Sequence, residues 1–138
     1  MLNREGNAYE DEWHTYIAGA VHHVSKYDIG GFCGWVDADQ ENPYDNKAMA
    51  VYNSFGKLLG YIPADELKNY REWCDAQPRP CVGFVFLEGN QFRGRVKILQ
   101  PCNEKFLVEE FSKYLQWVND NYGKKYLPKN MSIQFDVE

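Results

Sequence analysis

The sequence lacks the features that mark several common protein classes. Its four cysteines, Cys33, Cys74, Cys81 and Cys102, include no C-x-x-C pair, so their spacing does not indicate a structural zinc site. There is no run of about 20 apolar residues, and residues 1–14 are polar and acidic without an apolar signal segment. We therefore expect a cytoplasmic chain with reduced thiols.

Motifs for catalysis are also missing. No Ser or Cys lies in a recognised nucleophile motif, and the sequence has no glycine-rich phosphate loop. These absences argue against an enzyme, and we expect no cofactor.

Positive charge is scarce but unevenly distributed. The chain has 15 Lys and Arg against 20 Asp and Glu, a formal net charge of −5. This balance disfavours non-specific nucleic-acid binding, which depends on cations meeting phosphates. Residues 1–45 hold 2 basic and 9 acidic side chains, whereas residues 46–102 hold 8 basic and 5 acidic ones. The central part of the chain can therefore carry a local basic patch.

The residues that are present indicate one small globular domain. The chain has 138 residues, of which 44% are apolar, enough for a single core. Aromatic residues make up 16%. Such rings can fill the core of a small barrel, or they can be exposed as stacking platforms for bases.

Six segments have the alternation or the β-branched and aromatic content of strands. Gly19 interrupts the first and predicts a bend, and Gly30-Gly31 predicts a turn. Asn53-Ser54-Phe55-Gly56 and Gly89-Asn90 each predict a hairpin. The predicted strands are residues 13–24, 32–39, 48–53, 57–62, 81–88 and 91–99.

Two helices are predicted after these hairpins. Pro63 suits the first turn of a short helix that buries Leu67, Tyr70 and Cys74. A longer helix of about five turns ends near Gly123. Its apolar face consists of Leu107, Phe111, Tyr114, Leu115, Val118 and Tyr122.

The pattern divides the chain into three parts. We expect a flexible leader over residues 1–12 and a mainly β (α+β) small barrel of about six strands over residues 13–102. A helix and a strand extend it over residues 103–138, because residues 131–137 alternate between apolar and polar side chains. This extension either covers one barrel face or forms a homodimer contact.

A turn before the third predicted strand is the best candidate for a binding loop. Pro43 keeps Asn42 out of the helical region, and Asp45 and Asn46 can bond to nearby backbone amides. Tyr44 and Asp45 should therefore lie on a loop held by a rigid strand, where binding residues tend to collect.

This turn carries a resemblance to a known family. Asn42-Pro43-Tyr44-Asp45, followed by the run Gly60-Tyr61-Ile62-Pro63, resembles the HIRAN domain, which also occurs in Rad5-type ATPases and helicase-like transcription factor. Residues 17–23 look like the family's first strand, and the resemblance covers about residues 14–101. It implies a modified, OB-like β-barrel with helices.

The resemblance also implies a partner, because family members capture the 3′ end of single-stranded DNA in DNA repair or processing. By this match Tyr44 stacks on the terminal bases, and Asp45 accepts a hydrogen bond from the free 3′-hydroxyl. A carboxylate repels a phosphate, so it selects an unmodified end. DNA-processing proteins are further implied partners. The candidate DNA-binding residues are Tyr44, Asp45, His22, His23, Asn42, Lys47, Phe92, Arg93 and Arg95.

Two family cations have no counterpart at the matching positions. Val21-His22-His23 stands where the family has Arg-Tyr-Tyr, and Ala64 replaces a basic residue. Lys47, Arg93 or Arg95 could substitute for them.

The predicted strand 91–99 has one basic face and one apolar face. The basic face is a candidate for contacting a phosphate backbone, or it is an ordinary solvated face. Phe92 matches a DNA contact of the family, although the alternation equally places it in the core. The basic face consists of Arg93, Arg95 and Lys97, and the apolar face of Phe92, Val96 and Ile98.

Two further functions stay open. Asp37, Asp39 and Glu41 alternate and would share one face if their strand continued, so they could hold a divalent ion for phosphoester cleavage. The simpler interpretation is a solvated strand near a sheet edge. Alternatively, the barrel is a protein-interaction module that has lost its DNA contacts.

Overall fold

The computed structural model describes residues 12–123 of the chain. Most of the regular structure in this part is β. In chain order the elements are β1 (Glu12–Tyr16), α1 (Ala20–His23), the 3₁₀ helix η2 (Lys26–Asp28), β2 (Gly30–Ala38), β3 (Met49–Asn53), β4 (Leu58–Tyr61), α2 (Leu67–Cys74), β5 (Arg79–Glu88), β6 (Gln91–Leu99) and α3 (Glu104–Tyr122).

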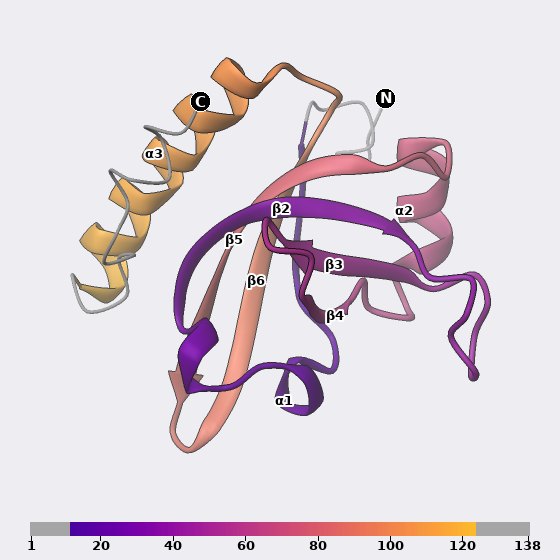
Figure 1. Ribbon diagram of the computed structural model, residues 1–138, viewed down its shortest axis with the longest axis horizontal. Coiled ribbons are helices and arrows are strands. Elements are labelled where there is room, and N and C mark those ends of the chain that lie inside the picture. Colours follow the sequence, from indigo (N-terminus) through magenta and orange to yellow (C-terminus); the bar gives the residue numbers. More distant parts are fainter. Residues whose placement is uncertain (1–11, 124–138) are drawn as a thin grey trace.

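The six strands form one antiparallel sheet in the order β1-β6-β5-β2-β3-β4. The sheet curls so that its two edges approach each other (Figure 1). They meet just after β1, where Ala18 and Tyr61 exchange backbone hydrogen bonds of 2.8 and 2.9 Å. Gly60 permits this closure, because a Cβ there would lie 2.4 Å from Ile17 Cγ2. The prediction of a mainly β, OB-like small barrel is confirmed.

The concave side of the sheet holds the main core. Alternate residues of every strand point inward, as the two-residue period of a strand requires. Tyr70 and Cys74 of α2 close one end of this core, so the predicted apolar stripe of the short helix is confirmed. The largest fully buried side chains of this cluster are Tyr70, Met49, Leu59, Ile98, Val36, Val51 and Val85.

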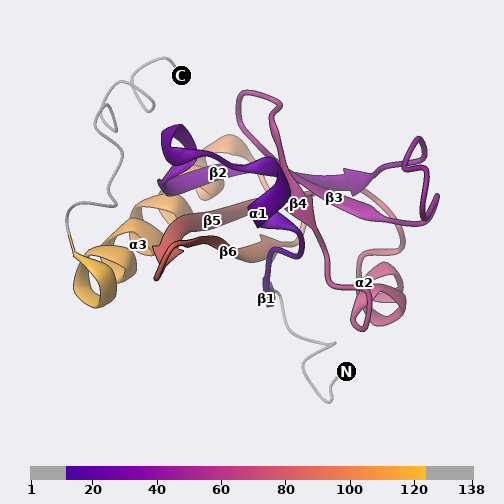
Figure 2. The same cartoon turned by 90° about the horizontal axis from the view of Figure 1, so that it is seen from below.

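Helix α3 covers the opposite side of the sheet (Figure 2). Asn103 caps its N-terminus by accepting a hydrogen bond from the Phe106 amide, and Gly123 follows its last residue. Phe111 and Leu115 are buried against Val82 and Phe84 of β5. The apolar face of α3 is therefore buried against the sheet. Of the two roles expected for the extension, the helix has the first, which is to cover one face of the barrel.

Gly31 of β2 leaves room for the packing of α3. A Cβ at this position would lie 2.3 Å from Leu115 Cδ2, so a larger residue would force the Leu115 side chain to move. The leader expected over residues 1–12 lies outside the described residues except for Glu12, which is the first residue of β1, and the strand expected over residues 131–137 lies entirely outside them.

The strand predicted over residues 13–24 is wrong beyond Tyr16. The strand ends at Tyr16, and Ala18 then pairs with Tyr61. Gly19 follows with a left-handed φ of 76° and precedes the single-turn helix α1. The first-strand resemblance of residues 17–23 therefore does not correspond to a strand in this chain.

Two boundaries also differ from prediction. Gly30-Gly31 is not a turn but the start of β2, because both residues pair with β5. Pro63 begins a turn, and α2 starts only at Leu67. Within residues 12–123, no helix is both long enough and apolar enough to span a membrane.

Candidate functional site

The loop between β2 and β3 is held by its own side chains. Asn42 Oδ1 accepts hydrogen bonds from the amides of Tyr44 at 2.8 Å and Asp45 at 3.0 Å. Asp45 Oδ1 in turn accepts from the Lys47 amide at 2.9 Å. Such Asx-type bonds fix the backbone without help from the core. The Tyr44 side chain projects from this fixed loop and is 95% exposed.

Asn42 and Asp45 thus serve first as organisers of the loop. The second carboxylate oxygen of Asp45 has no hydrogen-bond or ion-pair partner in the part of the chain that the structure describes. It can accept a hydrogen bond from a ligand while the first oxygen holds the turn.

Arg71 of α2 brings a cation to the base of this loop. Its Nη1 donates to the Lys47 carbonyl at 3.1 Å and lies 3.4 Å from Met49 Sδ. Among residues 12–123 it forms no ion pair, so its charge is uncompensated locally. No local sequence pattern indicates a role for Arg71, because its contact with the loop spans 24 residues.

His23 contacts the same end of the sheet through Tyr61. The two rings meet edge-on with centroids 5.7 Å apart. Tyr61 Oη donates to Asp39 Oδ2 at 2.9 Å, and burial together with this hydrogen bond raises the pKa of Tyr61. His22 is exposed on α1. The two histidines therefore lie on a helical turn and not on the strand predicted over residues 13–24.

The carboxylates proposed as a metal site do not share a face. β2 ends at Ala38, so Asp39 and Glu41 lie in the following loop and Asp37 alone is on the strand. Asp37 Oδ1 accepts from the Ala38 amide at 2.7 Å. No group of three His, Cys, Asp or Glu side chains in residues 12–123 is arranged to hold a metal ion. The metal-site hypothesis is wrong because its strand does not continue.

The basic face of β6 forms as predicted. Arg93 pairs with Glu88 at 3.3 Å, and Lys97, only 13% exposed, pairs with Glu110 at 3.1 Å and with Glu12 at 3.6 Å. Arg95 has neither an ion pair nor a hydrogen-bond partner within the described range. Its positive charge is the most available of the three.

Phe92 lies on the other face of β6, where it is partly buried against the main core. It still lines a surface hollow with Arg93 and Arg95. Phe92 therefore points to the core side of β6, as the alternation of apolar and basic residues along this strand predicts.

The structure separates the candidate residues into two groups. The loop of Asn42, Tyr44, Asp45 and Lys47 lies at one end of the sheet, and the β5–β6 hairpin lies at the other (Figures 1 and 2). Phe92, Arg93 and Arg95 belong to the hairpin group. One continuous site containing all the candidates is therefore not formed.

Comparisons with known proteins give one solved structure. No family model matches the chain, and a search of curated proteins finds no match. The chain is similar to the crystal structure of the HIRAN domain of human HLTF, with 16% sequence identity and a TM-score of 0.41, over 75% of this chain and 88% of that chain. The HIRAN domain is also the family whose sequence motifs this chain resembles.

Proposed function

We propose that the protein binds single-stranded nucleic acid at its end, using the loop between β2 and β3. The observation that carries this proposal is the Tyr44 ring, 95% exposed on a loop whose backbone is fixed by three side-chain hydrogen bonds. Because the loop backbone is already ordered, stacking of the ring on a base costs only the rotamer entropy of the Tyr44 side chain. Base–aromatic stacking contributes about 1–3 kcal/mol per base and tolerates any sequence.

Asp45 and the neighbouring cations supply the selection. The unbonded oxygen of Asp45 accepts a hydrogen bond from a terminal 3′-hydroxyl and repels a terminal phosphate. Lys47 and Arg71 attract the backbone of the strand beside it, which offsets part of the effect of the net charge of −5. A module that recognises an unmodified end suits DNA repair or processing.

Fluorescence anisotropy tests the proposal directly. The ligands are two single strands of about ten nucleotides, within the usual site size, labelled at the 5′ end and ending in a 3′-hydroxyl or a 3′-phosphate. We expect the hydroxyl strand to bind more tightly, Asp45→Ala to remove the preference, and Tyr44→Ala to weaken both complexes.

Asn46→Ala is the matched control, because Asn46 is exposed on the same loop and its side chain forms no hydrogen bond within residues 12–123. Equal affinity of the native, Tyr44→Ala and Asn46→Ala proteins would exclude the loop as the binding site.

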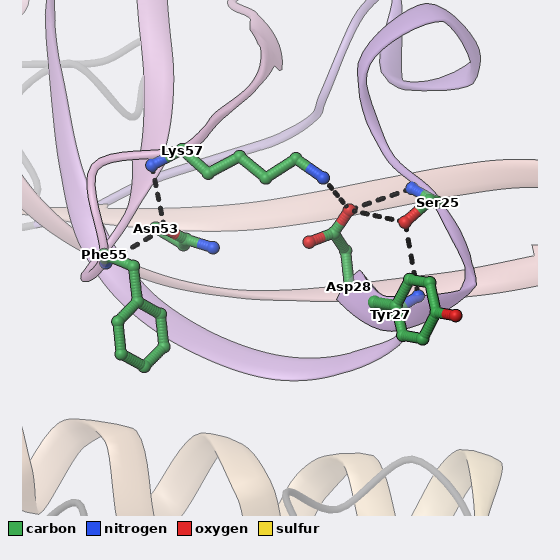
Figure 3. A network of polar contacts seen from close by, with 6 residues as sticks. All are labelled: Ser25, Tyr27, Asp28, Asn53, Phe55 and Lys57. Atoms are coloured by element: carbon green, nitrogen blue, oxygen red, sulfur yellow. Dashed lines mark hydrogen bonds and ion pairs between the residues drawn. The ribbon is translucent and has the colours of Figure 1, made fainter.

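A second candidate function is protein interaction. Tyr27 of η2 and Phe55 of the β3–β4 hairpin are each 85% exposed. Asn53 fixes the hairpin tip by accepting from the amides of Phe55 and Lys57, and Lys57 reaches across to Asp28 of η2 (Figure 3). Two rigidly held exposed rings favour a protein contact over a solvated surface. Failure of every oligonucleotide to bind would favour this function.

A further inference from the structure

A groove follows the outer face of β1 and β6 beside α3. Because α3 packs mainly over β5 and β2, Tyr16 of β1 and Arg95 of β6 stay exposed on this face, whereas Lys97 is only 13% exposed and bonds to Glu110 of α3. Two hollows of about 530 and 410 Å³ border this face, and the second continues past the end of β1 to residues 17–21 and to Phe92. Both are lined by Tyr16 and Arg95, which are directly opposite each other in the sheet. The two hollows therefore adjoin at this pair, and together they are called the outer groove below.

The floor of the outer groove is the basic face of β6. Alternate residues of a strand lie about 6.6 Å apart, so Arg93, Arg95 and Lys97 form an evenly spaced row. His14 of β1 lies opposite Lys97, just as Tyr16 lies opposite Arg95. Within this row Lys97 is held by Glu110 and Glu12 and Arg93 by the exposed Glu88, so Arg95 in the middle is the cation that a phosphate can reach without breaking an ion pair.

Exposed rings stand on both sides of this floor. Tyr16 of β1 is 54% exposed, and Trp117 of α3 on the opposite wall is 41% exposed. The Trp117 ring is held by contacts with Tyr114 and Tyr122, whose centroids lie 5.5 and 5.7 Å from its own. The arrangement of cations below and rings beside them is the one by which proteins hold single strands.

Most cations of the outer groove are already paired with carboxylates. Lys97 pairs with Glu110 at 3.1 Å and with Glu12 at 3.6 Å, and Lys113 also pairs with Glu110, whereas Arg95 has no ion-pair partner within residues 12–123. Glu66 is turned toward the protein, since its oxygens accept from Trp13 Nε1 at 3.1 Å and Thr15 Oγ1 at 2.8 Å. Glu88 is paired with Arg93 in a solvent-exposed bridge, which a phosphate can replace at little cost.

Glu110 fixes the floor to the α3 wall. Its carboxylate is 8% exposed and bonds to Lys97 of β6 at 3.1 Å and to Lys113 of α3 at 3.3 Å. Burial alone would raise the pKa of Glu110, but Lys97 and Lys113 outweigh it and hold that pKa below its ordinary value of 4.5. The bridge keeps the groove preformed at neutral pH and leaves Arg95 open to a ligand.

We propose that the outer groove binds the body of a single-stranded nucleic acid, with Arg95 contacting a phosphate and Tyr16 and Trp117 stacking on bases. This inference shares its ligand class with the proposed function but assigns a separate site. An acidic peptide would use the cations, but nothing in its backbone would place a stacking ring beside each charge.

A circular single strand separates the two sites, because it has no end for the loop to recognise. A circle of about 30 nucleotides exceeds the usual site size of about 4–16 nucleotides. We expect the native protein to bind it, and Trp117→Ala to weaken binding roughly 5- to 140-fold. Arg95→Ala should lower the slope of log affinity against log salt by about 0.7, the value for one lost phosphate contact. Thermal melting of each variant checks that it is folded.

Two controls make the test specific. Lys105→Ala removes an exposed cation of α3 that does not line the groove, so it should leave binding unchanged. Tyr44→Ala should weaken binding of a linear strand with a 3′-hydroxyl but not of the circle.

The groove inference would be overturned if the native protein did not bind the circle, or if Arg95→Ala and Trp117→Ala left that binding unchanged. The binding of the linear strand would still test the loop. If the native protein binds the circle but binds the linear 3′-hydroxyl and 3′-phosphate strands equally well, the proposed function would be overturned and the groove inference would stand. Displacement of the circle by polyglutamate as efficiently as by unlabelled circle would show simple anion binding and would overturn the assigned ligand.

Discussion

The loop between β2 and β3 and the outer groove both display aromatic rings beside cations, yet they are built at different scales. The loop is held by Asn42 and Asp45 through bonds to residues at most three positions away. The groove joins Tyr16 of β1, Arg95 of β6 and Trp117 of α3, which are distant in sequence. The first is a local structure, and the second exists only when the whole fold does.

This difference determines what a substitution can change. A change in the loop alters a binding surface and leaves the core intact. A change under α3 alters the groove and the global stability together, since the helix wall is part of a buried cluster with Val82 and Phe84. Stability and binding should therefore separate in the loop and stay coupled in the groove.

Phe111→Ala should give the largest effect, because it attacks the support of the groove. Phe111 is fully buried between α3 and β5, and removing such a ring costs about 3–5 kcal/mol of unfolding free energy. Urea denaturation followed by circular dichroism measures this loss. Phe106→Ala on the same helix removes a ring that is 45% exposed and should cost far less. Equal losses would mean that α3 does not pack on the sheet as described.

Glu110→Gln should give an intermediate, pH-dependent effect. At neutral pH the loss of charged hydrogen bonds to Lys97 and Lys113 should cost about 1–3 kcal/mol. Because the folded pKa lies below the ordinary 4.5, the stabilisation is complete above that pH and is lost as the pH falls through the lowered value.

Urea titrations of the native and Glu110→Gln proteins at several pH values measure the difference in unfolding free energy. The difference should be constant above about pH 5 and shrink in more acidic buffer. A difference that stays the same at every pH would show that the ionised carboxylate does not hold the groove together.

Local patterns in the sequence were sufficient where structure is local. Gly56 and Gly89 adopt positive φ of 84° and 63° at the two predicted hairpins. The alternation along β6 and the apolar stripe of α3 are also found as predicted, because period-2 and period-3.6 patterns report which side chains turn inward.

Features set by distant partners were not predictable in the same way. The aromatic and β-branched content of residues 13–24 favours a strand, but pairing of Ala18 with Tyr61 ends it and Gly19 turns the chain into α1. Arg71 reaches the loop from another element, and the groove needs α3 placed beside β6. Neither arrangement leaves a signal in adjacent residues.

Asn42→Ala tests whether the loop is held locally. Losing the bonds to the Tyr44 and Asp45 amides should cost about 1–2 kcal/mol of local stability, while the main core is untouched. Hydrogen exchange measured by NMR should speed up at those two amides and stay unchanged in β5 and β6. Asn46→Ala is the control, and faster exchange throughout the sheet would contradict a self-contained loop.

Tyr44→Ala should produce the smallest change in stability. The ring is 95% exposed, so its removal should alter the unfolding free energy by less than about 0.5 kcal/mol. The same substitution at Tyr114, only 9% exposed under the groove, should cost several times more, because it opens a cavity beneath α3. Urea denaturation of the two variants side by side measures this contrast. If Tyr44→Ala were as destabilising as Tyr114→Ala, the Tyr44 ring would be packed in solution and could not be a free stacking surface.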